Sequence, residues 1–438
     1  MPQSSVPVEP REEVLYGTQT RLSLQNFGAP ARRVGDIPVF VRYYALVKRA
    51  AASVNCSFGV LDEAVATAIV AACDEVAAGQ HAAQFPTALV LGGGGTTTNM
   101  NVNEVVAARA AQIAGLPVHP NDHVNASQST NDTVPTAIAL TVIDLSRGPL
   151  EALEDLATAL LEKATECEDT RYLGRTCLQD AVSVGAAQTL RAQAGAVRRT
   201  AHGLDEAVRV LAAVPLGATV LGTSVGAPAG FARACTAALA ALVDIEISPA
   251  PDLFDALAHL DPYAAVADAA ARAALTVAKI AADLRLRSSG PYGGLAEVTL
   301  PALQAGSSIM PAKVNPVVPE YAMQLSYRVR GAAYTVSCAV AAGELELNVM
   351  EPVILDALLD IFQDLGQAAT SMATLCVRGM EWNGLRRLEN LSHALDPWVE
   401  LAGRSGYEAA AAARGAGRNG VAAAPARLSA TDAQPAPS

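Results

Sequence analysis

Apolar residues recur at three- and four-residue spacings over several long stretches of the chain. This period places apolar side chains on one face of a helix. It predicts helices at 38–54, 61–78, 103–114, 181–214, 263–286 and 319–344, and one from Pro135 through the leucines of 150–161. Several of these segments are apolar on most faces, as expected for helices buried on more than one side. We find no internal repeat, and alternating strand patterns only in short pieces.

Composition supports a mainly α fold. Hydrophobic residues make up 51% of the 438 residues and aromatic residues only 4%. Alanine, valine and leucine dominate, and alanine both favours helix and lets neighbouring helices approach closely. The chain is too long for one ordinary core. We therefore expect a bundle of long helices that is completed by partner chains.

Charge and cysteine usage exclude several classes of function. A net charge of −12 argues against nucleic acid, whose phosphates require a basic surface. The seven cysteines form no CxxC pair or zinc-like spacing, which fits reduced thiols. The first residues lack the apolar core of a signal peptide. The uncharged segment 210–232 contains prolines and glycines, which favours a buried helix–loop over a membrane span. We expect a soluble, cytoplasmic protein without a metal site.

Three polar clusters interrupt the helical pattern, at Gly92–Asn103, His119–Asp132 and Gly306–Pro316. Each has short hydroxyl or amide side chains beside glycine or a helix start. This combination suits anions, because helix N-termini and exposed backbone N–H groups favour carboxylates and phosphates. One such cluster alone is more often a helix cap. Three clusters, one with Lys313 between a glycine and a proline, favour a binding site. We interpret Gly306–Pro316 as a mobile catalytic loop.

The clusters resemble the signature regions of the aspartase/fumarase superfamily. GSSIMPAKVNP (306–316) matches its GSSxMPxKxN signature, and TTTNMNVNEV (96–105) and HPNDHVNASQSTNDTVPTA (119–137) match two other regions. YGTQTRLSLQNF, GRTCLQDA and GELELNVMEP agree as well, so the resemblance runs from about residue 15 to 384. The flanks HPNDHVN and KVNPVVPE resemble aspartase more than fumarase.

The resemblance implies a three-domain subunit in a homotetramer. The domains would be a mostly helical N-terminal domain (1–128), a central long-helix bundle (129–382) and a short C-terminal domain with a disordered tail (383–438). The central helices would pack into a tetrameric core, and each active site would combine regions of three subunits. The family's partner is a small dicarboxylate, and neither a cofactor, nucleic acid nor membrane is implied.

The resemblance also implies the chemistry, which is proton removal beside a carboxylate followed by loss of the β-substituent. Ser307 would be the general base on a closing loop, aided by Lys313. Hydroxyls and amides would stabilise the aci-carboxylate, Lys313 would help to hold the other carboxylate, and Asn131 would face the leaving group. The implied substrate-binding residues are Thr96, Thr97, Asn99, Ser129, Thr130, Asn131, Thr176, Ser308, Met310 and Asn315. His119, Asn121 and Asp122 match either a second acid site near the entrance or a helix cap.

The chain departs from the family pattern at Cys177, where GRTHLQDA usually places histidine. That histidine normally contacts the leaving group and pairs with a glutamate, here Glu320. A thiol is smaller and a weaker hydrogen-bond donor. The exchange is either tolerated or opens the pocket to a larger N-substituent. Tyr172 also replaces a usual lysine, and the segment 222–231 is shorter than in the family.

We therefore predict a carbon–nitrogen lyase that eliminates ammonia, or an N-substituted amine, from L-aspartate or a derivative to give fumarate. One alternative is a class II fumarase-like hydratase acting on malate, and another is a lyase for a different substituted succinate. A catalytically silent homologue is the third reading. A silent homologue is disfavoured because the chain retains the signature residues Ser307, Lys313, Asn315, Thr96 and Asn131 together.

Overall fold

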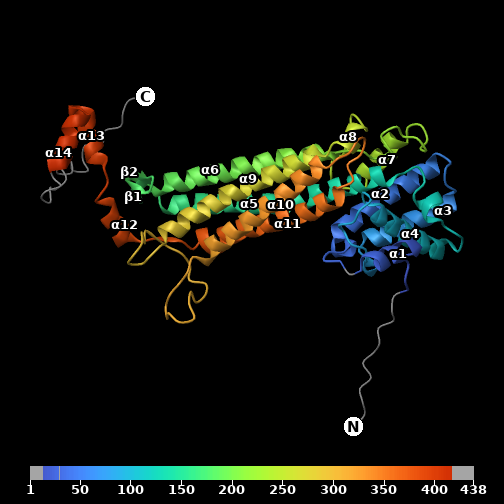
Figure 1. Ribbon diagram of the computed structural model, residues 1–438, viewed down its shortest axis with the longest axis horizontal. Coiled ribbons are helices and arrows are strands. Elements are labelled where there is room, and N and C mark those ends of the chain that lie inside the picture. Colours follow the sequence, from blue (N-terminus) through green and yellow to red (C-terminus); the bar gives the residue numbers. More distant parts are fainter. Residues whose placement is uncertain (1–12, 29, 417–438) are drawn as a thin grey trace, which may run out of the picture. The chain divides into compact units, whose positions relative to one another are not determined.

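The computed structural model describes residues 13–28 and 30–416 of the chain (Figure 1). These residues divide into two compact units. The first unit comprises Met1–Leu153, Arg199–Thr276 and Gln324–Ala369, and the second comprises Glu154–Arg198, Val277–Met323 and Thr370–Ser438. The predicted 1–128, 129–382 and 383–438 domains remain a prediction. Residues 417–438, which carry the predicted disordered tail, lie outside the described residues.

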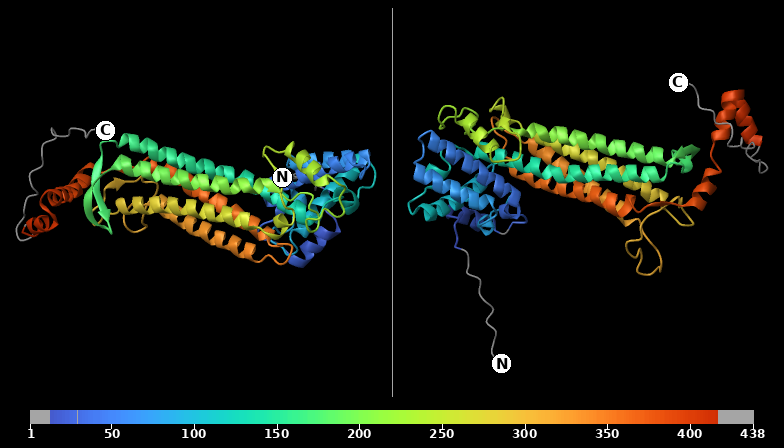
Figure 2. Two further views of the ribbon diagram at one scale, coloured as in Figure 1. Left: turned by 90° about the horizontal axis from the view of Figure 1, so that it is seen from above. Right: turned by 180° about the vertical axis from the view of Figure 1, so that it is seen from behind.

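Helices dominate both units, which confirms the predicted mainly α class. They are α1 (Thr18–Phe27), α2 (Pro38–Ser57), α3 (Glu63–Ala77), α4 (Thr96–Ala114), α5 (Thr130–Glu166), α6 (Ala186–Arg209), α7 (Phe231–Ala240), α8 (Asp255–Ala258), α9 (Asp261–Arg287), α10 (Val317–Ala341), α11 (Glu351–Ser371), α12 (Gly384–Leu391), α13 (Asp396–Ser405) and α14 (Tyr407–Ala416). The unit boundaries fall within α5, α6, α9, α10 and α11. Within each unit, the segments of these long helices lie side by side (Figures 1 and 2).

The strands form three two-stranded sheets. They are β1 (Arg171–Thr176) with β2 (Gln179–Gly185), β3 (Ala213–Val214) with β4 (Ser248–Pro249), and β5 (Val298–Thr299) with β6 (Glu381–Trp382). The β3–β4 pair is parallel and the other two are antiparallel.

The polar, glycine-rich segment before α4 ends earlier than the sequence predicted. We expected helix only from residue 103, but α4 begins at Thr96, directly after the four glycines. Gly95 precedes the helix with a φ of 82°, a left-handed conformation that favours glycine. Its missing Cβ also matters, because a Cβ there would lie 2.8 Å from Val134. The glycine run therefore brings the start of α4 close to the start of α5.

Helix α5 begins at Thr130, five residues before the predicted start at Pro135. The Asp132 carboxylate accepts the backbone N–H of Ser129 at 3.0 Å, which satisfies one of the free donors at the helix start. Pro135 therefore lies inside the helix rather than in its first turn. The prediction failed because it used the proline and overlooked the capping capacity of Asp132.

The helix predicted at 181–214 was wrong at its N-terminal end. Residues 179–185 form β2, which pairs with β1 in an antiparallel hairpin, and helix α6 begins only at Ala186. Cys177 and Leu178 form the two-residue connection, with φ values of 52° and 61°. A two-residue loop with both φ values positive has the geometry of the tight hairpin turns that match strand twist. Without an Asn-Gly pair, the sequence lacked the usual signal for this hairpin.

The first unit has a closely packed helical core. Helix α2 packs against α3 and α7, and α3 packs against α4. The fully buried side chains of α2 include Tyr44 and Lys48, a polar pair four residues apart on one helix face. A buried lysine is rare in an otherwise apolar helix unless it is paired.

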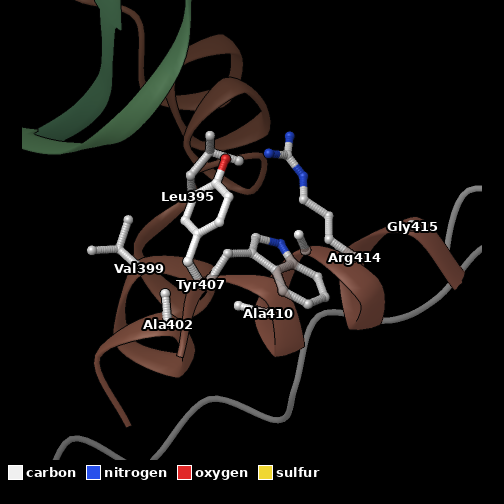
Figure 3. Close-up of a pocket in the computed structure, with 9 residues that line it drawn as sticks. Leu395, Val399, Ala402, Tyr407, Ala410, Arg414 and Gly415 are labelled. Atoms are coloured by element: carbon white, nitrogen blue, oxygen red, sulfur yellow. The ribbon is translucent and has the colours of Figure 1, made fainter. Parts of the chain in front are cut away.

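The C-terminal helices α13 and α14 belong to the second unit and line an open pocket of about 500 Å³ (Figure 3). Its walls are mostly apolar, and Arg414 contributes the charged group. None of the predicted site residues lines it. Across the described part of the chain, no helix has the length and apolar character that crossing a membrane requires.

Candidate active site

The loop 306–316 lies in the second unit between α9 and α10, and its two ends are tied together. The Gly306 N–H donates to the Lys313 carbonyl at 2.8 Å, and the Asn315 amide donates to the Gly306 carbonyl at 2.9 Å. A Cβ at residue 306 would lie 2.7 Å from the Lys313 carbonyl oxygen, so glycine is required for this close approach. The signature residues Gly306, Lys313 and Asn315 thus form the base of the loop.

Ser307 follows this base and points its hydroxyl oxygen at the backbone of the loop. Its Oγ accepts the N–H of Met310 at 3.1 Å and the N–H of Ile309 at 3.3 Å. Hydrogen bonds donated to an oxygen favour its charged form. The loop therefore provides two of the donors that an alkoxide at Ser307 would need.

The remaining loop side chains face outward. Ser308, Met310 and Lys313 are exposed, and Ile309 is 85% exposed. An exposed run of this kind, with apolar and cationic side chains together, is free to meet a ligand or another chain. This arrangement suits the predicted role of the loop as a cover over the substrate.

In the first unit, the structure brings the Gly92–Asn103 and His119–Asp132 clusters together. The Asn99 amide donates to Thr130 Oγ1 at 3.0 Å and to Asn125 Oδ1 at 3.1 Å, while its own oxygen accepts from the Tyr44 hydroxyl at 3.0 Å. Asn99 is buried, so these protein groups take up its hydrogen-bonding capacity. In this structure Asn99 orients Thr130.

Thr96 and Thr97 open helix α4 at the edge of the same region. Thr96 is exposed, and its hydroxyl donates to the Gly93 carbonyl at 2.7 Å. Ser129, Thr130 and Asn131 are half-buried at the start of α5. Two helix N-termini with short hydroxyl side chains thus lie next to each other, an arrangement that favours a carboxylate.

Beneath the α5 N-terminus lie two buried ionisable groups, Lys48 and Asp132. The Lys48 ammonium donates to Asn125 Oδ1 at 2.9 Å. Burial lowers the pKa of Lys48, and burial raises the pKa of Asp132 although backbone N–H groups and Lys48 act to lower it. The sequence patterns did not predict either residue as part of the site. The position of Lys48 as a lone lysine on an apolar helix face could have indicated a buried, functional charge.

His119 acts as a cap. Its Nδ1 accepts the backbone N–H groups of Asn121 and Asp122 at 3.3 and 3.1 Å, at the start of the π-helical turn Pro120–Val124. These contacts match the capping alternative for the HPND segment. A second acid site at His119, Asn121 and Asp122 remains a prediction.

Thr176 and Cys177 lie at the exposed end of the β1–β2 hairpin in the second unit. The next residue, Leu178, is 70% exposed. The left-handed conformation of Cys177 is unfavourable for most side chains, and such residues cluster at functional sites. Cys177 is therefore presented at a projecting tip.

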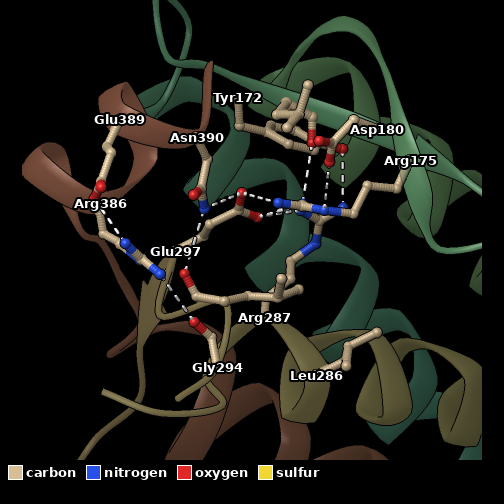
Figure 4. Close-up of polar contacts among 12 residues, drawn as sticks. Tyr172, Arg175, Asp180, Leu286, Arg287, Gly294, Glu297, Arg386, Glu389 and Asn390 are labelled. Carbon is tan, nitrogen blue, oxygen red and sulfur yellow. Dashed lines mark hydrogen bonds and ion pairs between the residues drawn. The ribbon is translucent and has the colours of Figure 1, made fainter. Parts of the chain in front are cut away.

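A buried charge cluster holds the root of this hairpin (Figure 4). The Arg175 guanidinium contacts both carboxylate oxygens of Glu297, at 2.9 and 3.1 Å, and Arg287 contacts Glu297 at 3.2 Å. Asn390 donates to the same carboxylate at 3.0 Å. The Arg287 guanidinium also lies 4.2 Å from the centre of the Tyr172 ring, a cation–π contact. The tyrosine that departs from the family pattern is therefore part of this cluster.

Glu320 has a partner that the sequence did not predict. We expected it to lose its partner with the missing histidine, but Arg285 Nε lies 3.3 Å from Glu320 Oε1. The two residues come from α9 and α10 in the second unit. The expectation failed because only the tertiary structure brings these helices together. Among residues 13–28 and 30–416, no His, Cys, Asp and Glu side chains are grouped to hold a metal ion.

Comparison with known proteins gives consistent relatives. A family model described as a lyase matches residues 8–331. The chain is 40% identical over 378 residues to aspartate ammonia-lyase of Escherichia coli K12, covering 85% of this chain and 79% of the relative. It is also 40% identical over 413 residues to class II fumarate hydratase of Pseudomonas syringae pv. tomato, covering 92% and 88%. A crystal structure of a fumarate lyase:delta crystallin from Brucella melitensis, bound to cobalt, aligns with a TM-score of 0.89 at 38% identity, covering 93% and 90%.

Proposed function

Because this chain belongs to the lyase family of the aspartase/fumarase superfamily, we propose that it eliminates ammonia, or an N-substituted amine, from L-aspartate or a derivative to give fumarate. The predictions of the superfamily, of a mainly helical fold and of a lyase are confirmed by these relatives. The leaving group and the catalytic residues belong to the proposal.

The observation that carries the proposal is the environment of the Ser307 hydroxyl. Serine is a weak base in water, and its alkoxide needs donors and positive charge nearby. The N–H groups of Ile309 and Met310 supply donors, and Lys313 lies on the same loop. Ser307 then removes the proton from the carbon beside a carboxylate, and loop closure excludes water and strengthens each polar contact.

Proton removal places a second negative charge on the neighbouring carboxylate. Fixed dipoles stabilise such a charge without reorganisation. The adjoining starts of α4 and α5, with Thr96, Ser129 and Thr130, support this role, together with Ser308. The other carboxylate is held by Lys313, Asn315 and Thr176. The electrons of the broken C–H bond form the double bond, and the β-substituent leaves with its bonding pair.

The aspartase-like flanks of the signature regions favour an amine as the leaving group. Two observations favour other substrates. Class II fumarate hydratase matches at the same 40% identity, which supports a hydratase acting on malate. Cys177 at the exposed hairpin tip leaves room for a larger substituent than histidine does, which supports an N-substituted aspartate or another substituted succinate.

We further propose a homotetramer in which three subunits build each site. Tyr327 and Tyr334 are 56% and 73% exposed on α10 and lie seven residues apart, on one helix face. Exposed aromatic side chains in a row support a contact with another helix. The exposed Ser307 loop and Cys177 hairpin tip are suited to reach a neighbouring copy. Light scattering on the purified protein tests this assembly.

The test of the function is the ultraviolet absorbance of fumarate. Purified protein is incubated with L-aspartate, L-malate and a series of N-substituted aspartates. We expect fumarate from aspartate or an N-substituted aspartate. Fumarate from malate alone selects the hydratase. No fumarate from any of these substrates contradicts the elimination.

A further inference from the structure

The side-chain amide of Asn131 is held in one orientation. Its Nδ2 donates to the Val220 carbonyl oxygen at 2.8 Å. A carbonyl oxygen can only accept, so the NH₂ end of the amide must face Val220. Asn131 Oδ1 is then the free end, with no hydrogen-bond partner among the described residues, on a half-buried side chain.

The Val220 carbonyl is itself fixed through the buried carboxylate of Asp132. One oxygen of Asp132 accepts the N–H of Ser129 at 3.0 Å, and the other accepts those of Gly217 at 3.2 Å and Thr219 at 2.8 Å. Asp132 is fully buried. One carboxylate thus joins the start of α5, where Asn131 lies, to the turn that carries Val220.

The turn 217–222 leaves little freedom of its own. Gly217 has a φ of 90°, and a Cβ there would lie 2.4 Å from the Ala232 Cα. The Gly222 N–H donates to the Ala218 carbonyl at 3.1 Å. The backbone around Val220 is therefore closely packed on one side and bonded to Asp132 on the other.

We propose that Asp132 is a positioning residue that, through the turn 217–220, presents Asn131 Oδ1 as an acceptor to the leaving group. This inference rests on the proposed function and on the role that the family resemblance implies for Asn131, which would face the departing amine. An ammonium group donates charge-assisted hydrogen bonds, which are roughly twice as strong as those of a neutral donor. A fixed acceptor at this position therefore favours a protonated amine over a hydroxyl group.

The experiment measures the reverse reaction, addition of ammonia to fumarate, in the full-length Asp132→Asn variant. The new side chain at residue 132 has an NH₂ group, which cannot accept a hydrogen bond, in place of one carboxylate oxygen. It would therefore lose the backbone N–H bonds on one side, and the turn would no longer be held. We expect the KM for ammonia to rise about 10- to 100-fold, the effect of losing one charge-assisted hydrogen bond, while the KM for fumarate changes less than threefold. A general structural defect would raise both KM values together.

A second variant guards against misfolding, because Asp132→Asn leaves Lys48 buried without its counter-charge. Lys48→Met/Asp132→Asn removes both charges, and circular dichroism and light scattering check both proteins. The same rise in the KM for ammonia alone supports the proposal. Unchanged KM values, or equal rises for ammonia and fumarate, overturn this inference. The proposed function still holds in that case if the wild-type protein adds ammonia to fumarate. A wild-type protein that adds no amine to fumarate overturns both.

Discussion

Arg175 binds the fully buried carboxylate of Glu297 through two guanidinium nitrogens, one residue before Thr176 on the same strand. Planar, two-point contacts of this kind fix geometry as well as charge. Glu297 directly precedes β5, on the segment that leads to the Ser307 loop, and Arg287 at the end of α9 shares its carboxylate. Within the second unit, the hairpin and the segment that leads to the Ser307 loop are therefore held by the same buried carboxylate.

The first prediction concerns Glu297→Gln. Gln keeps the size of the side chain but leaves Arg287 without its counter-charge and Arg175 with only Asp180, whose Oδ1 lies 3.9 Å from Arg175 Nε. Removing one partner of a buried ion pair costs about 3–5 kcal/mol of stability. We expect a loss in this range by urea denaturation. As a control, Arg191→Gln removes an exposed pair with Glu168 and should cost less than about 1 kcal/mol. Equal small losses for both variants would contradict a structural role for Glu297.

The second prediction concerns Ser307→Ala. Loss of the general base should lower kcat for fumarate formation by at least about 100-fold, the lower range for such catalysis. The loop base at Gly306, Lys313 and Asn315 does not use the serine side chain, so the assembly should stay intact by light scattering. Ser308→Ala, which removes one stabilising hydroxyl only, should lose much less. Substantial turnover by Ser307→Ala would show that another group is the base.

Cys177→His tests the leaving-group pocket. Histidine is among the side chains that tolerate the left-handed conformation found at Cys177, so the variant should keep the hairpin. If Cys177 enlarges the pocket, the variant gains kcat/KM on L-aspartate and loses it on a bulkier N-substituted aspartate. Both values are measured by fumarate absorbance on the same preparation. Unchanged values for both substrates would make Cys177 incidental.

Mixed tetramers test whether the sites are shared. Ser307→Ala and Asn131→Ala subunits, each expected to be far less active alone than the wild type, are co-expressed with different tags, and the mixed species is purified. If Ser307 and Asn131 of one site come from different subunits, random mixing should restore about one quarter of the wild-type sites. If both residues serve the same site from one subunit, no mixture recovers activity. The two homogeneous variants are the controls.

The pH dependence of stability should reveal Glu351, which is buried at the start of α11. Burial raises its pKa well above the usual value. The unfolded chain loses this proton near pH 4.3, so stability falls as pH rises above that value until the folded pKa is reached. Gln at this position cannot ionise, so the free energy of unfolding of Glu351→Gln should fall less steeply as pH rises.

Urea denaturation of both proteins at pH 5, 6.5 and 8 measures this difference. It should grow in favour of the variant by up to about 1.4 kcal/mol for each pH unit. Glu346→Gln removes an exposed carboxylate from the same segment and should follow the wild-type curve. Parallel curves for Glu351→Gln and wild type would mean that Glu351 ionises normally in the folded protein.

Much of the fold could be predicted because helix periodicity is a local property. The predicted helices at 38–54 and 61–78 correspond to α2 and α3, and those at 263–286 and 319–344 to α9 and α10, within a few residues. The errors lie where a signal other than the apolar period decides. Asp132, three residues after Ser129, starts α5 ahead of Pro135. Pairing with the neighbouring strand β1 makes residues 179–185 a strand, where the sequence predicted helix.

The superfamily, the helical class and the polar clusters could be predicted from the sequence alone, because signature motifs and apolar periods depend on neighbouring residues. The groups that support them became apparent only in the folded chain. In the folded protein, Glu320 pairs with Arg285, and Glu297 binds Arg175 next to the Cys177 turn. Asp132 binds the turn whose Val220 carbonyl accepts the Asn131 amide. In the sequence, Glu320 lies 35 residues from Arg285, and Glu297 lies 122 residues from Arg175. No local pattern specifies such contacts, since they arise when helices and turns pack and buried charges must find partners.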